Sequence, residues 1–423
     1  MRSLRASLIS AIAVTLLAGQ TVTRPKDVRE IAKAGSSALP QLQELLKNPD
    51  RDIRIEAVKQ ITEIGPPRSL DPLILATQDN DPDVQMLATD GIVNFYLPGY
   101  VKTGVTAPLR KVGSSIKGKF TDTNDQVIDA YLTPRPDAIA ALGKLVRSGS
   151  SMDSRADAAR AVGILRGKAA VPDLEDAAHS KNSELIYEAL IALQKIRDES
   201  AGPHVSFLLH DLDSKVQIAA IETMGLLRNK DAVPALTDVL THSKDAKVKR
   251  AALTSLAMLP VDKSRAVYMQ YMNDKDDRLR AAAAEGIGRL KNPADLPMLE
   301  KAWQDEAKPQ PRLSLAFAMV LDGKTELSEF SPLQFLINNL NSAAYNGEAQ
   351  PFLVELARDP KVRNALYAPM QSGTRAEKIG LAGVLARSGD SGSVAPLQKL
   401  TNDPDPAVAQ AALTAVRNLQ ARM

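Results

Sequence analysis

Residues 214–242, SKVQIAAIETMGLLRNKDAVPALTDVLTH, decide how the rest of the chain is interpreted. Apolar residues at helical spacing predict a first amphipathic helix, with one face made by Val216, Ala219, Ala220, Met224 and Leu227. After a polar break at 229–231, a second helix places Leu236, Val239 and Leu240 on one side. Two short antiparallel helices cannot bury these faces alone, so the stretch predicts neighbours of the same kind.

The second helix recurs along the whole chain at intervals of 31 to 36 residues. Alignment on Leu236 gives twelve apolar positions: Leu42, Leu73, Leu109, Leu142, Leu174, Val205, Leu236, Tyr268, Leu299, Leu333, Leu366 and Leu397. The residue five places further on is polar in all twelve units. Both columns together indicate a row of stacked helix pairs with Leu174, Leu236 and Leu299 in its core.

The first helices recur as well. Six units carry alanine sixteen residues before the aligned position: Ala57, Ala158, Ala189, Ala220, Ala252 and Ala283. Alanine there allows helix axes to approach to the low end of the usual ~8–10 Å. Most first helices are expected to begin near a residue that accepts from free N–H groups: Asp50, Asp81, Asp153, Asn182, Asp213, Asp245, Asp276 or Asp403.

These motifs resemble the short form of the HEAT repeat, the type also found in bilin lyases. The clearest matches are DRDIRIEAVKQITEIG from Asp50, DSKVQIAAIETMGLL from Asp213 and DDRLRAAAAEGIGRL from Asp276. The resemblance implies an all-α fold, an α-solenoid in which about twelve antiparallel helix pairs form a right-handed superhelix, as in HEAT and armadillo proteins. It also implies that the second helices line the concave surface.

The N-terminus differs from the repeats. Arg2 and Arg5 precede an apolar run at 8–18, which is typical of a secretory signal peptide over residues 1–20. The run is shorter than the ~20 residues of a membrane span, although an uncleaved anchor remains an alternative. We therefore expect an exported protein, periplasmic or secreted. The solenoid would occupy residues 21–423, with irregular units near 95–150 and 323–372 and a capping helix at 403–423.

Composition excludes several functional classes. The chain has no cysteine, which rules out disulfides, thiol nucleophiles and thiolate metal sites. Removal of residues 1–20 lowers the formal net charge from +3 to +1, which does not fit a dedicated nucleic-acid-binding protein. None of the four histidines is followed by glutamate, so the His-Glu pairs of HEAT-like di-iron hydroxylases are missing. We expect no catalytic activity and no cofactor.

A polar stripe on the second helices is the first candidate for a partner-binding surface. If these helices line the groove, the stripe presents Arg110, Arg147, Glu175, His179, His210, Asn273, Gln304 and Asn338. His179 and His210 occupy the same position in adjacent units. They could approach one ligand in an enzyme or enzyme accessory subunit, lyase-like or metal-assisted, but the simpler interpretation is a polar column facing water.

The enlarged turn at 95–104, FYLPGYVKTG, is the second candidate. Tyr96 and Tyr100 would contact a partner from it, or would pack on their own unit. Trp303 and Tyr268 are interpreted as core residues. The sequence as a whole favours a monomeric, non-catalytic interaction or scaffolding module that binds a protein or peptide along its concave face, without nucleic acid or stable membrane insertion. An envelope-structural role without a single partner is a weaker alternative.

Overall fold

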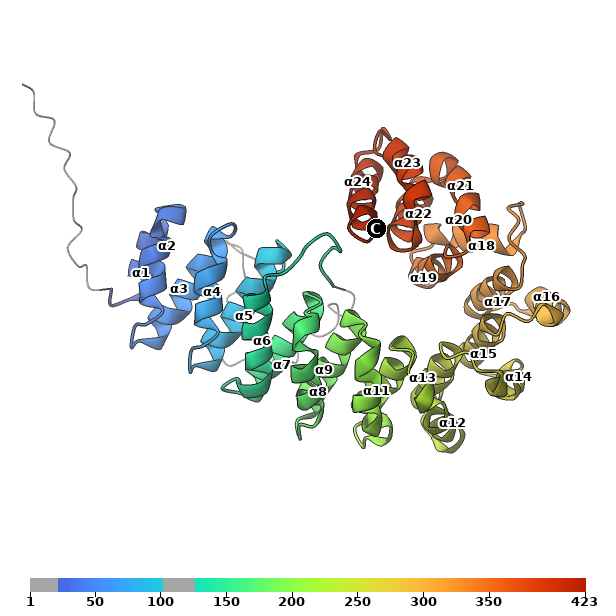
Figure 1. Cartoon of the computed structure of the whole chain (residues 1–423), viewed down its shortest axis with the longest axis horizontal. Coiled ribbons are helices and arrows are strands. Elements are labelled where there is room, and N and C mark those ends of the chain that lie inside the picture. The colour runs from blue at the N-terminus through green and yellow to red at the C-terminus, as the bar shows by residue number, and fades with distance from the viewer. Residues whose placement is uncertain (1–21, 102–125) are drawn as a thin grey trace, which may run out of the picture.

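The fold is a single curved row of helices. The computed structural model describes residues 22–101 and 126–423, and every regular element within these ranges is a helix. The helices lie side by side along the row, which bends into an open ring (Figure 1). The predicted all-α solenoid is confirmed. Among the helices of the described ranges, none combines the length and apolarity that a bilayer crossing requires.

Twelve helices of the described ranges form one layer, in which each packs on the next. This inner layer contains α1 (Pro25–Ala32), α3 (Arg51–Ile64), α5 (Pro82–Tyr96), α7 (Met152–Ile164), α9 (Ser183–Ile196), α11 (Ser214–Leu226), α13 (Ala246–Ala257), α15 (Asp277–Arg289), α17 (Pro309–Leu321), α19 (Asn346–Leu356), α22 (Arg375–Ser388) and α24 (Pro406–Gln420).

The remaining α-helices, most of them shorter, form an outer layer. It contains α2 (Leu39–Leu45), α4 (Leu70–Ala76), α6 (Pro136–Ser148), α8 (Val171–Ala178), α10 (Gly202–Val205), α12 (Val233–His242), α14 (Arg265–Tyr271), α16 (Leu296–Asp305), α18 (Pro332–Asn338), α20 (Pro360–Ala365), α21 (Tyr367–Ser372) and α23 (Ser391–Leu400). Short 3-10 turns accompany them: η1 (Gly35–Ala38), η3 (Lys168–Ala170), η4 (Glu199–Ala201), η5 (Ser206–His210), η6 (Lys230–Ala232), η7 (Asp262–Ser264), η8 (Pro293–Asp295) and η9 (Asn339–Asn341).

Capping side chains fix where the inner helices begin. Six predicted caps are confirmed, because their side chains accept from first-turn N–H groups: Asp50, Asp81, Asn182, Asp213, Asp245 and Asp276. Two predictions are wrong by two residues. Ser151, not Asp153, caps α7, since Ser151 and Ser154 form a reciprocal capping box. Asp405 caps α24, while Asp403 pairs with Lys378.

Successive inner helices approach one another to backbone contact. The six predicted alanines are completely buried. Glycines stand where even a methyl group would collide: a Cβ on Gly163 would lie 2.7 Å from Ala192 Cα, one on Gly225 2.9 Å from Ser255 Cα, and one on Gly288 2.4 Å from Ala318 Cα. The outer helices instead bury large side chains, including Leu174, Leu236, Leu299 and Tyr268, at 0% exposure.

This difference in side-chain size decides the direction of the bend. The inner helices pack closely and the outer helices spread apart, so α13, α15 and α17 face the inside of the ring, whereas α12, α14 and α16 lie outside (Figure 1). The prediction that the second helices line the concave surface is therefore wrong. The pairing also differs from the prediction, because α12 packs mainly on the helix that follows it, α13, and little on α11.

The enlarged unit proves to be an insertion between neighbouring repeats. The insertion is the segment between α5 and α6, residues 97–135. The predicted unit at Leu109 lies outside the described residues. Helix α5 nevertheless packs directly on α7, and α4 contacts α6, so the row continues without an intervening pair. The Gln85 side chain confirms this continuity, since its Oε1 accepts from Ser150 N at 2.9 Å and from Ser150 Oγ at 2.8 Å.

The insertion reaches the far end of the row. Ala130 N donates to Asn418 Oδ1 at 2.7 Å, and Asn418 Nδ2 donates to Asp129 Oδ1 at 3.0 Å. Asn418 belongs to α24, the last helix, so residues separated by nearly 290 positions are in contact. These bonds join the segment that leads into α6 to the last helix. In Figure 1 this segment and α24 lie on facing sides of the opening of the ring.

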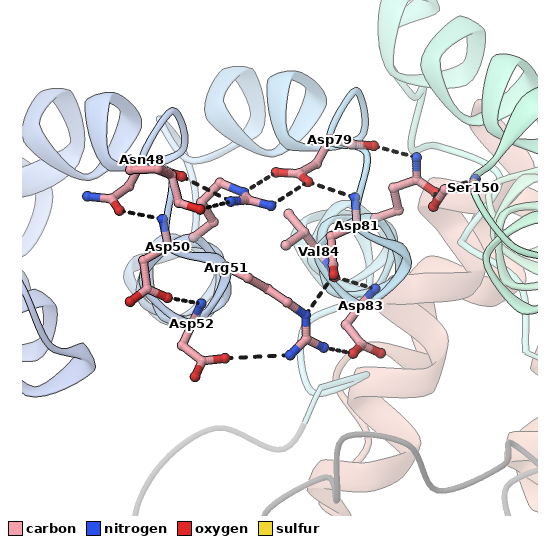
Figure 2. A network of polar contacts seen from close by, with 12 residues as sticks. Asn48, Asp50, Arg51, Asp52, Asp79, Asp81, Asp83, Val84 and Ser150 are labelled. Carbon is pink, nitrogen blue, oxygen red and sulfur yellow. Dashed lines mark hydrogen bonds and ion pairs between the residues drawn. The ribbon is translucent and has the colours of Figure 1, made fainter.

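Charged side chains connect neighbouring inner helices along the row. Arg51 Nε donates to Asp81 Oδ2 at 2.6 Å, and Arg54 Nε donates to Asp79 Oδ2 at 2.7 Å (Figure 2). Arg54 Nη1 also donates to the Asn48 carbonyl at 3.0 Å, in the turn before its own helix. The same kind of link recurs further along the chain in the pairs Arg250–Asp276, Arg280–Glu306 and Lys378–Asp403.

One buried carboxylate has no such partner. Asp322, at the C-terminal end of α17, is 8% exposed, and neither of its oxygens has a hydrogen-bond partner. Burial, reinforced by the nearby Asp295, raises the pKa of Asp322 from 3.8 to about 7. The negative end of the helix dipole lies at the same point and also disfavours the charge.

We predict that Gly288→Ala destabilises the protein by ~1–3 kcal/mol, because the new Cβ would meet the Ala318 backbone and force α15 and α17 apart. The matched control is Gly347→Ala in α19, where a Cβ would meet nothing within 4 Å. The control should be neutral or stabilise by up to ~1 kcal/mol. Urea unfolding of both variants checks this, and equal midpoints would contradict the proposed close packing.

We predict that Asp322→Asn stabilises the protein above pH 7 by ~1–3 kcal/mol and has little effect near pH 4. The folded-state pKa of Asp322 is raised, so the wild type loses stability as pH rises from the unfolded value of 3.8 through about 7. Thermal melting of wild type and variant between pH 4 and 8 measures the difference. A gain that does not depend on pH would argue against a titrating Asp322.

Candidate functional site

A cleft of about 480 Å³ lies on the concave side of the row. It crosses five successive inner helices, from α11 to α19. Its charged lining residues are Glu222, Lys247, Arg250, Arg278, Glu285 and Glu348. Apolar side chains stand among them, including Ile218, Met258 and Phe352. The cleft therefore offers both signs of charge together with apolar contact area.

The lining residues repeat with the helices that carry them. Glu222, Thr254 and Glu285 each follow their helix cap by nine residues, and Lys247 and Arg278 each follow theirs by two. Positions two, five, six, nine and thirteen beyond the cap lie on one face of a helix. Because the inner helices are stacked, these positions form columns that run along the concave wall.

A buried ion-pair network forms the floor of the cleft. Arg289 Nη1 donates to Glu285 Oε2 at 3.0 Å, and Arg289 Nε and Nη2 each donate to the Glu355 carboxylate at 3.0 Å. Ser314 Oγ donates to the other Glu285 oxygen at 3.1 Å. The Arg289 guanidinium also lies 4.8 Å from the centre of the Phe317 ring. The network joins α15 to α19 across α17, where the two parts of the apolar core meet.

The surroundings disfavour negative charge in the cleft. Burial raises the pKa of Glu285, although Arg289 and Ser314 oppose the shift. Partial desolvation within the cleft raises the pKa of Glu222, although this residue is exposed at the cleft surface, and desolvation together with the Glu285 charge raises that of Glu348. Arg250 is held by Asp276 at 2.6 Å. Lys247 and Arg278 are exposed within the cleft and remain accessible to a bound molecule.

The polar stripe predicted from the sequence lies on the opposite side of the row. Its described members belong to the outer helices or to the turns after them: Arg147, Glu175, His179, His210, Asn273, Gln304 and Asn338. Several are engaged with their own neighbours. Arg147 forms an ion pair with Asp173, and Glu175 Oε1 lies 2.9 Å from His204 Nδ1. A role for these residues in partner binding stays a prediction, but the face assigned to them was wrong.

The two candidate histidines are exposed on the outer layer. The His179 ring stacks on Phe207 of the next unit, with centroids 4.4 Å apart and planes at 8°. His210 ends η5. Over the part of the chain that the structure describes, no group of three or more His, Asp or Glu side chains is placed to hold a metal ion.

The tyrosines of the enlarged turn pack on the protein itself. Tyr96 lies against the core, and its hydroxyl accepts from Arg135 N at 2.8 Å. Tyr100 is largely covered, and burial raises its pKa, with a further contribution from Asp90. Arg110, the remaining candidate in this region, lies outside the described residues.

The prediction that Tyr268 and Trp303 are core residues is confirmed for Tyr268 and only partly for Trp303. Tyr268 is completely buried, and its hydroxyl donates to the Leu256 carbonyl at 2.7 Å. Trp303 packs on the core but is only partly buried, edge-on to Phe335 at 6.0 Å.

Sequence reasoning missed the cleft because it followed only the columns of the second helices. The signal was present in the first helices, where charged residues interrupt alanine-rich stretches at a fixed distance from each cap. Glu285 stands in AAAAEGIG and Glu222 in AAIETMG. Because the second helices were expected to line the concave surface, the columns of the first helices were not predicted to form a binding wall.

The comparison with family models agrees with this architecture. The family model described as HEAT repeats matches residues 20–92, 203–266 and 239–319. No curated protein matches the chain. The chain therefore contains HEAT repeats in its N-terminal and central parts.

Solved structures that resemble the chain share little sequence with it. The CpcE–CpcF complex of phycocyanin lyase from Nostoc sp. PCC7120 is 17% identical over 63% of this chain and 91% of that chain, with a TM-score of 0.37. Human deoxyhypusine hydroxylase, in complex with glycerol, is 18% identical over 67% and 96%, with a TM-score of 0.28. An engineered protein is 17% identical over 90% and 98%, with a TM-score of 0.32.

We predict that Arg289→Met destabilises the protein by ~3–5 kcal/mol at pH 8, because Glu285 is left buried without its cation. The loss should be smaller at pH 5. Burial already raises the pKa of Glu285 above its ordinary 4.5, and without Arg289 the protonated form is favoured further, so stability falls as pH rises.

The double variant Glu285→Gln/Arg289→Met tests the cause. It should recover a large part of the loss at pH 8, because no unpaired charge remains at Glu285. Chemical unfolding of the wild type, both single variants and the double variant gives the interaction free energy between Glu285 and Arg289. Purely additive effects would show that the two side chains act independently.

Proposed function

We propose that the protein is a non-catalytic binding module that holds a segment of a partner protein in its concave cleft. The observation that carries the proposal is the composition of the cleft wall, in which exposed charges of both signs alternate with apolar side chains across five stacked helices. Such a surface offers many weak, distributed contacts. That suits a polypeptide better than a small apolar ligand.

The buried charges of the cleft already have structural partners. Arg289 holds Glu285 and Glu355, and Asp276 holds Arg250. These pairs keep the wall rigid, which lowers the entropy cost of binding to it. Lys247, Arg278 and Glu222 are exposed above this floor. They are the side chains that we propose contact the partner directly.

The presence of HEAT repeats supports a role in protein interaction, since solenoids of this kind present extended concave surfaces for binding. We also propose that the protein works outside the cytoplasm after removal of residues 1–20. The apolar run behind Arg2 and Arg5 supports export. N-terminal sequencing of the mature protein tests this part, and an intact Met1 on the native protein would refute cleavage.

We predict that a photocrosslinking amino acid at Thr254, inside the cleft, captures one discrete partner in the native setting. The same group at Gln304, which is exposed on the outer helix α16, should capture none. The double variant Lys247→Glu/Arg278→Glu, made with the crosslinker still at Thr254, should abolish the product by reversing two charges of the wall. Mass spectrometry identifies the product.

The opposite pattern would refute the proposed site. A product from Gln304 and none from Thr254 would move the binding surface to the outer layer, where the sequence had placed it. Circular dichroism of the charge-reversed protein serves as the control, because both substituted residues are exposed and the variant should melt as the wild type does.

A further inference from the structure

Three consecutive inner helices end in an arginine with an unusual backbone conformation. Arg166, Arg197 and Arg228 follow α7, α9 and α11 at intervals of 31 residues and have φ values of 50°, 62° and 55°. Helix ends in this left-handed region normally use glycine or asparagine, because a side chain there costs stability. The chain keeps a long cationic side chain at this place in three neighbouring repeats.

The three arginines occupy the same position of the repeat and share the left-handed backbone conformation. Each backbone N–H closes the end of its helix: Arg166 N donates to Gly163 O at 3.1 Å, Arg197 N to Leu193 O at 3.0 Å, and Arg228 N to Gly225 O at 3.2 Å. All three side chains are exposed. Since α7, α9 and α11 are packed side by side, the arginines form a row along one edge of the inner layer, with one guanidinium for each repeat.

This row carries little compensating negative charge. Across the described residues, no carboxylate lies within ion-pair distance of Arg166 or Arg197. Arg228 Nε is 3.8 Å from Glu199, and Asp129 of the insertion lies near Arg166.

Cations also face one another at the opening of the ring. Partial desolvation of the guanidinium, together with the charges of Arg166 and Arg228, lowers the pKa of Arg197. Burial and Arg166 likewise lower the pKa of Arg387, on α22 at the other end of the ring. An anion bound here would relieve this repulsion.

The spacing of the row indicates what kind of anion fits. Packed helices lie ~8–10 Å apart, so equivalent backbone positions on successive helices, including those of the three arginines, repeat at about that interval. A peptide in the polyproline II conformation has three residues per turn and rises ~3.1 Å per residue, so side chains at every third position lie on one face about 9 Å apart. A carboxylate at every third residue would therefore meet one arginine per repeat, with charge-assisted hydrogen bonds.

We propose that Arg166, Arg197 and Arg228 bind an acidic segment of the partner that lies extended along the edge of the inner layer, with Asp or Glu at every third position. This inference rests on the proposed function and specifies the chemistry of the partner. Arg387 of α22, whose pKa is lowered by the charge of Arg166, adds positive charge near one end of this row.

A fluorescent peptide of about twelve residues with Glu at every third position, separated by Pro and Ser, tests the proposal by anisotropy on the full chain. It should bind, and more weakly as salt increases. A peptide of the same composition with adjacent glutamates should bind at least about threefold less well. The variant Arg166→Gln/Arg197→Gln should weaken binding about tenfold or more, since charge-assisted bonds are lost.

The matched control is Arg68→Gln/Arg358→Gln, which removes two exposed arginines at other places in the row and should leave binding unchanged. Unchanged melting of both variants shows that they fold. Equal binding of the two peptides, or unchanged binding by Arg166→Gln/Arg197→Gln, would overturn the proposal. Binding of inorganic polyphosphate without binding of the peptide would also overturn it, since the row would then recognise another anion.

The outcome can be separated from that of the proposed function. If the peptide test fails while the Thr254 crosslink persists, the cleft still binds a partner and only the acidic segment is refuted. If both fail, the proposed function is refuted as well.

Discussion

The backbone contact between successive inner helices is the constraint on which the rest of the structure depends. Glycine against alanine or serine, as at Gly163, Gly225 and Gly288, lets these helices approach more closely than the leucine-lined outer helices can. When successive helices are closer together in one layer than in the other, the row must curve toward the layer with the smaller spacing. The hollow interior, the cleft and the contact between the insertion and α24 all follow from that curvature.

Charged groups at the helix starts define the register of this packing. An aspartate caps each of several inner helices, while an arginine from the preceding helix, such as Arg51 or Arg250, binds the same carboxylate. One side chain thus serves its own helix and the junction with its neighbour. Because the links are partly exposed, each contributes modestly to stability, and their main effect is to fix how one repeat sits on the next.

The cleft lies on the concave face of the inner helices, which the curvature leaves open to solvent. The floor is held by Arg289, which joins helices that are not adjacent in the row, and the exposed charges stand above it. The arginines at the left-handed helix ends lie along an edge of the same layer. Rigid repeats therefore present both groups of side chains at fixed intervals, which favours recognition of a partner segment whose own side chains repeat at a matching distance.

The local structure of this protein can be read from the amino-acid sequence alone. Apolar periodicity, cap residues and a repeat of about 31 residues were enough to predict the helices, the solenoid and the buried Leu174, Leu236 and Leu299, because each depends on neighbours close in the chain. Three features required the three-dimensional structure: the concave layer, the pairing of α12 with α13, and the contact between the insertion and α24. These features depend on the relative spacing of two helix layers summed over many repeats, and no single repeat contains that information.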